Sequence, residues 1–336
     1  MAFTIQRGTN ISHWLSQSDR RGTERRAWFT RADVQRLAGL GLDHLRIPID
    51  EEQMWIEKGA REKEAFDLLD AALDWSKDAG LRAVVDLHIL RTHHFISEKE
   101  PLLYTDPKEA GRFAGLWQDL SAHLQRRPGD WVAYELMNEP VATDPQNWNR
   151  VARAAYDALR KLEPERMIVL GSNRWNSAST FADLDVPEGD KHLVLTFHYY
   201  SPMLITHYRA SWTPIGKYDG PIHYPGQPIA PHDWEKLPHE MKDLLASQNT
   251  FYNAGVMERD LAQPLAVQKR THLPLYCGEF GVHHPAPDPI RLAWYRDFRA
   301  VLAKHGIAWA NWDYKGSFAL FDAKGKATVV VEGLLK

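Results

Sequence analysis

Short apolar runs alternate with longer amphipathic stretches from one end of the chain to the other. This alternation is typical of strands and helices that follow one another in a parallel sheet. The predicted strands are Thr4–Gly8, His44–Pro48, Ala83–His88, Trp131–Asn138, Met167–Gly171, Leu193–Tyr199, Leu273–Gly278 and Ile307–Trp312. Eight such units predict a closed (β/α)8 barrel, the TIM-barrel fold, that occupies residues 1–336 as a single domain.

The amphipathic stretches between these runs predict helices, several of which have Pro in the first turn and Gly after the last. The predicted helices are Thr30–Leu40, Lys63–Ala79, Pro107–Arg126, Pro145–Leu162, Ala178–Leu184, Tyr252–Thr271 and Pro289–His305. An open doubly wound sheet is the alternative, but it would be expected to carry a Gly-rich phosphate loop after its first strand. None follows Thr4–Gly8. The C-terminal stretch from Gly325 is too short to predict as an eighth helix.

Composition excludes several classes of partner. The formal charge of -3, with acidic and basic residues mixed, gives no basic surface for nucleic acid. The single cysteine, Cys277, excludes an intrachain disulfide and a cysteine-based metal cluster. No apolar run approaches the roughly 20 residues of a membrane span, so we expect no membrane partner. We also expect a monomer. The first residues lack the features of a signal peptide, which predicts a cytoplasmic protein, or a secreted one if a leader has been removed.

The stretch WVAYELMNEP, residues 131–140, ends a predicted strand on a carboxylate. Its apolar run is typical of a strand buried on both faces, and Pro140 blocks further pairing. Asn138 and Glu139 therefore lie at the C-terminal end of a strand, where the catalytic groups of parallel α/β folds gather. Glu139 is a candidate catalytic acid, with a helix-capping or solvated Glu as the alternative.

Polar residues end most of the other predicted strands as well. Including the pair just named, they are Arg46, His88, Asn138, Glu139, His198, Tyr200, Glu279 and Trp312. Any one of them is explained by packing, but their coincidence favours a site at one barrel mouth. Glu139 and Glu279 should face each other there. Glycoside cleavage needs such a pair, since one carboxyl group protonates the leaving oxygen while the other attacks or activates water.

The interval 200–251 interrupts the alternation, because it is rich in Pro, His, Tyr and Trp without sustained periodicity. A long insertion at the C-terminal end of a strand would overhang the site, so we expect an inserted subdomain that shapes the cleft. Its aromatic residues, among them Trp212, argue against a disordered linker. Because the many Pro and Gly residues offer this interval little core of its own, we expect Trp212 to contact substrate. The alternative is a buried Trp212 that anchors the subdomain.

Taken together, the motifs at these positions resemble those of glycoside hydrolase family 5. In chain order they are RGTN, HLRIP, DLH, NEP, FHYYSP, YCGEFG and WANWDYKG. The likeness is greatest to bacterial endoglucanases with a subdomain after the sixth strand. It implies a retaining endo-β-1,4-glucanase that acts on a β-glucan oligosaccharide or polysaccharide and needs no cofactor. By this resemblance Glu139 is the acid/base and Glu279 the nucleophile.

The resemblance also implies roles for the residues around the pair. Arg46 and Tyr200 would hold the nucleophile, and Asn138 would bind the 2-hydroxyl of the sugar. Trp312 would lie under the cleaved sugar. The remaining implied residues are the supporting His88 and His198 and the substrate-binding Trp212, Asn10 and Trp14. The segment NISHW and the segment LIT at 204–206 differ from the endoglucanase pattern, which leaves substrate identity and chain length open.

Several alternatives remain within the same chemistry, namely a β-mannanase or glucomannanase, an exo-acting β-glucosidase-like enzyme, and a transglycosylating enzyme. A non-catalytic carbohydrate-binding protein is the alternative of another class. Loss of Glu139 or Glu279 would have supported it, and both are present.

The adjacent histidines at 93–94 and 283–284 are the candidate metal ligands in this sequence. Neighbouring side chains on a loop rarely converge, and no H-E-x-x-H spacing occurs, so we expect no metal. Asp86 and Glu135 are expected to be buried partners of Arg46 or of the site histidines rather than catalytic groups.

Overall fold

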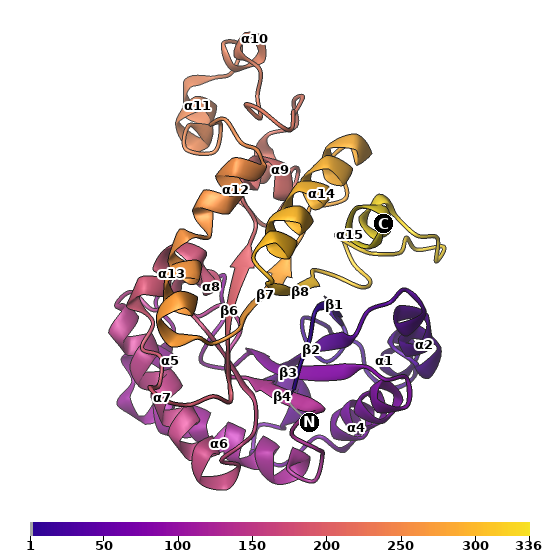
Figure 1. The fold of residues 1–336 in the computed structure, drawn as a ribbon, viewed down its shortest axis with the longest axis vertical. Coiled ribbons are helices and arrows are strands. Elements are labelled where there is room, and N and C mark those ends of the chain that lie inside the picture. The colour runs from indigo at the N-terminus through magenta and orange to yellow at the C-terminus, as the bar shows by residue number, and fades with distance from the viewer. Residues whose placement is uncertain (1–2) are drawn as a thin grey trace.

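The computed structural model describes residues 3–336, and its strands close into one parallel barrel (Figure 1). Each strand pairs with the next along the chain, and the last returns to the first. The strands are β1 Arg7–Asn10, β2 His44–Asp50, β3 Arg82–Ile89, β4 Val132–Glu135, β5 Ile168–Gly171, β6 Leu193–Tyr199, β7 Leu275–Phe280 and β8 Ala308–Asn311. The predicted (β/α)8 TIM barrel is confirmed.

Strand boundaries differ from the predicted ones by a few residues. The first strand lies later than Thr4–Gly8, because its ladder partners fix it at Arg7–Asn10 between β2 and β8. The fourth strand ends at Glu135, earlier than the predicted Asn138. The chain nevertheless stays beside its neighbour, since the Asn138 N–H donates to the Leu87 carbonyl at 2.9 Å. The residues of the NEP motif therefore still lie at the C-terminal end of the barrel.

Helices alternate with the strands and surround the barrel (Figure 1). The α-helices are α1 Gly22–Trp28, α2 Arg31–Gly39, α3 Glu51–Met54, α4 Lys63–Asp78, α5 Leu102–Thr105, α6 Pro107–Leu124, α7 Pro145–Leu162, α8 Asn173–Asn176, α9 Met203–Thr206, α10 Pro231–Trp234, α11 His239–Leu245, α12 Ala254–Asp260, α13 Ala262–Thr271, α14 Asp288–Lys304 and α15 Val329–Leu335. The 3-10 helices are η1 Ala178–Asp183 and η2 Pro214–Lys217. Among the described residues, no helix is long and apolar enough to cross a lipid bilayer.

The starts of the long helices follow from capping residues. Asp106 and Asp144 precede α6 and α7, and each carboxylate accepts the backbone N–H two residues further on. Proline occupies the first helical position in both, where no intrahelical N–H is needed. These signals are local, so α7 has the predicted boundaries.

The structure contains several short helices that were not predicted, and two further differences have a clear physical reason. The single helix predicted at Tyr252–Thr271 is divided into α12 and α13 at Leu261. At the C-terminus, α15 forms although the stretch is short, because it buries Val330, Val331 and Leu334. It packs on α14, where Gly333 lies so close to Tyr295 that an added Cβ would be 2.8 Å from the tyrosine Cβ. Tertiary packing therefore stabilises a helix that is too short to predict alone.

The inside of the barrel changes from apolar to charged along the strands. Side chains alternate between strand faces, so Val84, Asp86 and His88 of β3 share one face. Val84 belongs to a small buried cluster whose other members include Ala133 of β4 and Val194 of β6. The next residues toward the C-terminal ends of these strands are polar and equally buried. Because a buried charge is costly to desolvate, this charged layer indicates a functional site.

Between β6 and β7, residues 200–274 contain α9 to α13 and η2, and α10 and α11 project away from the barrel (Figure 1). The segment has an ordered interior, with Tyr218, Tyr224 and Ile229 buried. The prediction that residues 200–251 form a subdomain over the cleft stays a prediction.

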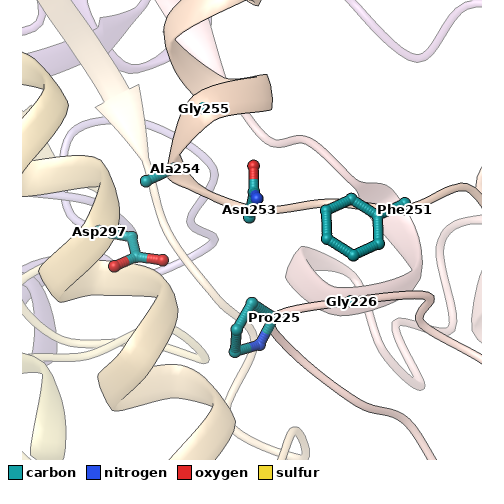
Figure 2. A pocket seen from close by; sticks show the side chains of 7 residues that line it. All are labelled: Pro225, Gly226, Phe251, Asn253, Ala254, Gly255 and Asp297. Carbon is teal, nitrogen blue, oxygen red and sulfur yellow. The ribbon is translucent and has the colours of Figure 1, made fainter.

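A shallow hollow lies where this segment meets α14 (Figure 2). Its volume is about 370 Å³. The lining residues are Pro225, Gly226, Phe251, Asn253, Ala254, Gly255 and Asp297. None of the polar residues that end the barrel strands contributes to it, so the hollow is distinct from the charged layer.

Candidate active site

Side chains from five strands of the barrel meet at its C-terminal end. Glu139 follows β4, while Glu279 lies within β7. Arg46 comes from β2 and His88 from β3, and His198 comes from β6. All of these side chains are buried, with only 9% of Glu139 and 4% of Glu279 exposed. The structure therefore brings together residues that are far apart in the sequence, as strand-end positions predict.

The two glutamates lie close to each other and to a shared histidine. One carboxylate oxygen of Glu139, one of Glu279 and a ring nitrogen of His198 are all within 4.8 Å of one another. Nδ1 of His198 is 3.0 Å from Oε1 of Glu139 and 3.7 Å from Oε2 of Glu279. Of the residues that the structure describes, only this group has the spacing of a metal site, and the adjacent histidine pairs do not. The expectation of a metal-free site stays a prediction.

Arg46 is the centre of the hydrogen-bond network beneath the pair. Its guanidinium is fully buried and donates to Oε1 of Glu279 at 2.7 Å. It binds Glu135 through two parallel hydrogen bonds of 2.8 and 2.9 Å, and Asp86 lies 3.1 Å away. Asp86 and Glu135 are thus the buried partners expected from the sequence. One cation faces three carboxyl groups, so the network does not neutralise all of them when ionised.

The two glutamates differ in the donors around them. Burial raises the pKa of Glu139 well above its usual range, and the neighbouring charge of Glu279 raises it further. Burial also raises the pKa of Glu279, but Arg46 acts in the opposite direction. In addition, the hydroxyl of Tyr200 donates to Oε2 of Glu279 at 3.0 Å. Because the donors favour the ionised form of Glu279, a proton shared by the pair resides on Glu139.

Asn138 has a donor available for a ligand. Its Oδ1 accepts from Arg46 at 2.9 Å, which fixes the orientation of the amide group. Its Nδ2 is buried and has no hydrogen-bond partner within the described part of the chain. A buried donor of this kind costs about 1–3 kcal/mol unless it is paired, so its position next to Glu139 favours a contact with a substrate hydroxyl.

His88 and Trp312 form a stacked pair at the mouth. Their ring centroids are 5.6 Å apart with an interplanar angle of 9°. Both ring nitrogens of His88 have partners, because Nδ1 lies 2.7 Å from Asp86 and Nε2 lies 3.1 Å from the amide of Gln17. Trp312 is 8% exposed. Its indole is held in one orientation, and its role as the platform under the sugar stays a prediction.

Trp212 reaches the neighbourhood of the site from the segment between β6 and β7. It is 51% exposed and packs edge-on against His283 with centroids 5.0 Å apart. His207 lies between Trp212 and the mouth. The centroid of the His207 ring is 6.2 Å from that of Trp212 and 5.1 Å from that of Tyr200. Trp212 is thus exposed, as contact with substrate requires. Contact with substrate stays a prediction.

Two residues predicted to bind substrate are instead buried. Trp14 is fully buried, and its indole N–H donates to the Arg25 carbonyl at 2.9 Å, which places it in the core. Asn10 is also fully buried. Its amide donates to the carbonyl of Gly278 at 2.9 Å and accepts from Arg46 at 2.8 Å, so it positions Arg46 rather than facing the mouth. Direct substrate contact by Trp14 and Asn10 stays a prediction, although both side chains have hydrogen-bond partners inside the protein.

The turn after β5 reaches the site, although none of its residues is among those predicted from the sequence. Asn176 accepts the backbone N–H of Glu139 through Oδ1 at 2.6 Å. Trp175 is 49% exposed beside it. The available signal was the pair of asparagines in NRWN directly after an apolar strand, because asparagine tolerates left-handed backbone angles.

The sequence and the fold are both similar to those of known proteins. Residues 7–317 match the family model described as cellulase, glycosyl hydrolase family 5. Endoglucanase C of Acetivibrio thermocellus is 29% identical over 320 residues, covering 93% of this chain and 92% of the relative. Cellodextrinase A of Ruminococcus flavefaciens is 29% identical over 311 residues, covering 90% and 84%. The solved structure of endoglucanase Cel5A from Thermotoga maritima is similar in fold, with a TM-score of 0.78, 23% identity and coverage of 98% and 96%.

Proposed function

Because the chain belongs to glycosyl hydrolase family 5, the cellulase family, we propose that it cleaves β-1,4-glucan chains internally with retention of configuration. The family and the endoglucanase relatives make it a glycoside hydrolase. The specific proposal is an endo-β-1,4-glucanase in which Glu139 is the acid/base and Glu279 the nucleophile.

The separation of the two carboxyl groups carries this proposal. Their nearest oxygens lie within 4.8 Å of each other. Retaining glycosidases have carboxyl groups about 5–5.5 Å apart, whereas inverting ones need about 6.5–9.5 Å to admit a water molecule. The short separation supports direct attack on the sugar by one of the two carboxylates.

The first chemical step uses the different donors of the two glutamates. The ionised Glu279 attacks the anomeric carbon and forms a covalent bond to it as the glycosidic C–O bond breaks. Glu139 transfers its proton to the departing oxygen. The donors from Arg46 and Tyr200 keep Glu279 ionised and aligned for this attack.

The second step reverses the roles of the same groups. Glu139, now ionised, takes a proton from water, and the resulting oxygen attacks the anomeric carbon. The bond to Glu279 breaks, which regenerates its carboxylate and restores the proton on Glu139. Two inversions give net retention. Throughout, the free Nδ2 of Asn138 would bind the 2-hydroxyl of the sugar, where contacts strengthen in the transition state.

A second candidate concerns the length of the substrate. One relative is named cellodextrinase, and it is as similar to this chain as the endoglucanase is, at 29% identity. Short soluble cello-oligosaccharides are therefore the second candidate substrate class. The same active site could cleave both substrate classes by the same two chemical steps.

Product sizing on a panel of substrates tests the proposal. The panel comprises carboxymethylcellulose, mixed-linkage β-glucan, glucomannan, cello-oligosaccharides and aryl β-cellobiosides. Internal cleavage predicts that the viscosity of carboxymethylcellulose falls early, when few reducing ends have been released. Release of short sugars without a fall in viscosity would favour the cellodextrinase. Cleavage of glucomannan alone would contradict both.

A further inference from the structure

We propose that Asn176 is a positioning residue for the acid/base. In this proposal its side-chain oxygen holds the backbone N–H of Glu139 and so fixes the unusual backbone conformation from which the Glu139 carboxyl group reaches the mouth. The inference rests on the acid/base role proposed above for Glu139. Asn176 itself does not touch the reacting atoms, so its effect is exerted through Glu139.

The backbone of Glu139 is held in a conformation that glutamate rarely adopts. Its φ angle is 45°, in the left-handed region, which is unfavourable for a residue with a Cβ and no local side-chain partner. The preceding N–H, of Asn138, still bonds to β3 through Leu87 at 2.9 Å. The N–H of Glu139 instead donates to Oδ1 of Asn176 at 2.6 Å, and this hydrogen bond is buried.

The turn that carries Asn176 has a conformation suited to this contact. Arg174, Trp175 and Asn176 have φ angles of 53°, 61° and 53°, so three successive residues are left-handed. The Trp175 N–H donates to the carbonyl of Pro140 at 3.0 Å, directly after Glu139. Its indole N–H donates to the Phe95 carbonyl at 2.7 Å. The turn is thus hydrogen-bonded to Glu139 and Pro140, and the Trp175 indole also bonds it to Phe95.

Space for the Asn176 side chain depends on a glycine at the end of β5. A Cβ at Gly171 would lie 1.7 Å from Nδ2 of Asn176, which real atoms cannot approach. The next residue, Ser177, forms a parallel bridge with His198. His198 in turn contacts Oε1 of Glu139 at 3.0 Å. The turn therefore carries Asn176, which bonds to the Glu139 backbone, and it also pairs with β6, whose His198 contacts the Glu139 carboxylate.

The same turn offers a matched control. Asn173 is buried, as Asn176 is, and also binds the loop after β4. It accepts from the N–H of Ala142 at 2.9 Å and donates to the carbonyl of Ala142 at 2.8 Å. Asn173→Ala therefore removes hydrogen bonds from the same loop without removing the partner of Glu139.

Leaving-group dependence distinguishes positioning of the acid from general support of the fold. Proton donation matters for aryl β-cellobiosides with poor leaving groups, such as phenol, and hardly at all for dinitrophenol. We expect Asn176→Ala to lower kcat/KM for phenyl cellobioside by about 10- to 100-fold, a fraction of the full effect of a general acid. For dinitrophenyl cellobioside we expect a change of less than about threefold. Asn173→Ala should affect the two substrates equally.

Two further variants keep the test decisive. Asn176→Asp retains the acceptor oxygen and should restore most of the loss on phenyl cellobioside. Gly171→Ala displaces the Asn176 side chain by another route and should reproduce the leaving-group pattern if Asn176→Ala lacks the wild-type circular dichroism spectrum. Equal losses on both substrates in Asn176→Ala, or the same pattern in Asn173→Ala, would overturn the positioning role.

Glu139→Ala, measured in parallel, separates this inference from the proposed function. A strong leaving-group dependence in Glu139→Ala with none in Asn176→Ala overturns only the role of Asn176. Absence of leaving-group dependence in Glu139→Ala overturns the acid/base assignment, and the inference with it.

Discussion

The network around Arg46 and the segment between β6 and β7 both border the barrel mouth, but they are built in opposite ways. The Arg46 network is fully buried, and its side chains are joined by hydrogen bonds of 2.7 to 2.9 Å. The segment instead exposes large rings, with Trp212 51% and Phe251 63% exposed. A buried network fixes one geometry, whereas an exposed ring can be exchanged with little effect on the fold.

The difference suggests a division of roles. Replacing one group of the network leaves unpaired charge in the barrel, so the positions that set the chemistry are constrained. Exposed rings of the segment contribute mainly contact area to a bound ligand. Chemistry should therefore depend on the network, and chain-length preference on the segment. Substitutions in the two regions test this division.

Removing either glutamate should have the largest effect, and the two effects should differ in kind. Glu279→Ala lacks the nucleophile and should lose activity by at least about 10⁴-fold in kcat. Added azide should attack from the vacated face and give the α-glycosyl azide. Glu139→Ala should lose about 10²- to 10⁴-fold on unactivated glucan yet keep turnover of dinitrophenyl cellobioside. Product analysis by NMR that showed the reverse pattern would exchange the two roles.

Arg46→Met should be destabilising as well as inactive. It leaves Asp86, Glu135 and Glu279 buried without their cation, a loss that typically costs about 3–5 kcal/mol. Urea unfolding measures the change. Arg209→Met in the segment is the control, because Arg209 is exposed, donates to the Asp219 carbonyl at 2.8 Å and otherwise lies over the Tyr208 ring, among the described residues. It should change the free energy of unfolding by less than about 0.5 kcal/mol. Equal stability of both variants would remove the distinction between the two regions.

Trp312→Ala should weaken catalysis without unfolding the protein. The ring is predicted to stack under the cleaved sugar and to contribute about 1 kcal/mol or more, so kcat/KM should fall by roughly fivefold or more. Thermal unfolding followed by circular dichroism should remain a sharp transition. A broadened transition with loss of the fold would instead assign Trp312, which is 8% exposed, to the core.

Trp212→Ala should lower kcat/KM on long glucans several-fold while changing it little on aryl cellobiosides, because only long chains reach an additional sugar-binding position. Phe251→Ala is the matched control, since this ring is also exposed in the segment but lines the hollow of Figure 2. It should leave both substrates unaffected. Equal losses on long and short substrates in Trp212→Ala would contradict a role in chain-length preference.

The sequence predicted the barrel and the strand-end residues well, because both depend on short-range patterns. An apolar run that ends in Asn138 and Glu139 marks a strand and its end directly. The buried partners of Arg46 were also anticipated, since Asp86 and Glu135 lie within apolar strands that offer few other cations. The burial of such residues follows from the alternation of side chains along a strand, which can be recognised in a single sequence.

Residues whose role depends on loop geometry could not be predicted in the same way. Trp14 follows the first strand, and its sequence context does not show that its ring is buried against Phe29. Asn176 depends on three successive left-handed residues, and no periodicity encodes that turn. The C-terminal helix α15 forms only because α14 offers it an apolar surface. In each case a contact with a distant segment decides the outcome.

Trapping the covalent intermediate shows whether Glu279 is the nucleophile of a double displacement assisted by Glu139. A dinitrophenyl β-cellobioside with fluorine in place of the 2-hydroxyl forms the intermediate quickly and releases it slowly, because the fluorine destabilises both transition states. Mass spectrometry of the digested protein should find the fluorocellobiosyl group on Glu279, with one group bound per chain. A label on Glu139, or an unlabelled protein that releases the α-anomer, would contradict a double displacement through Glu279.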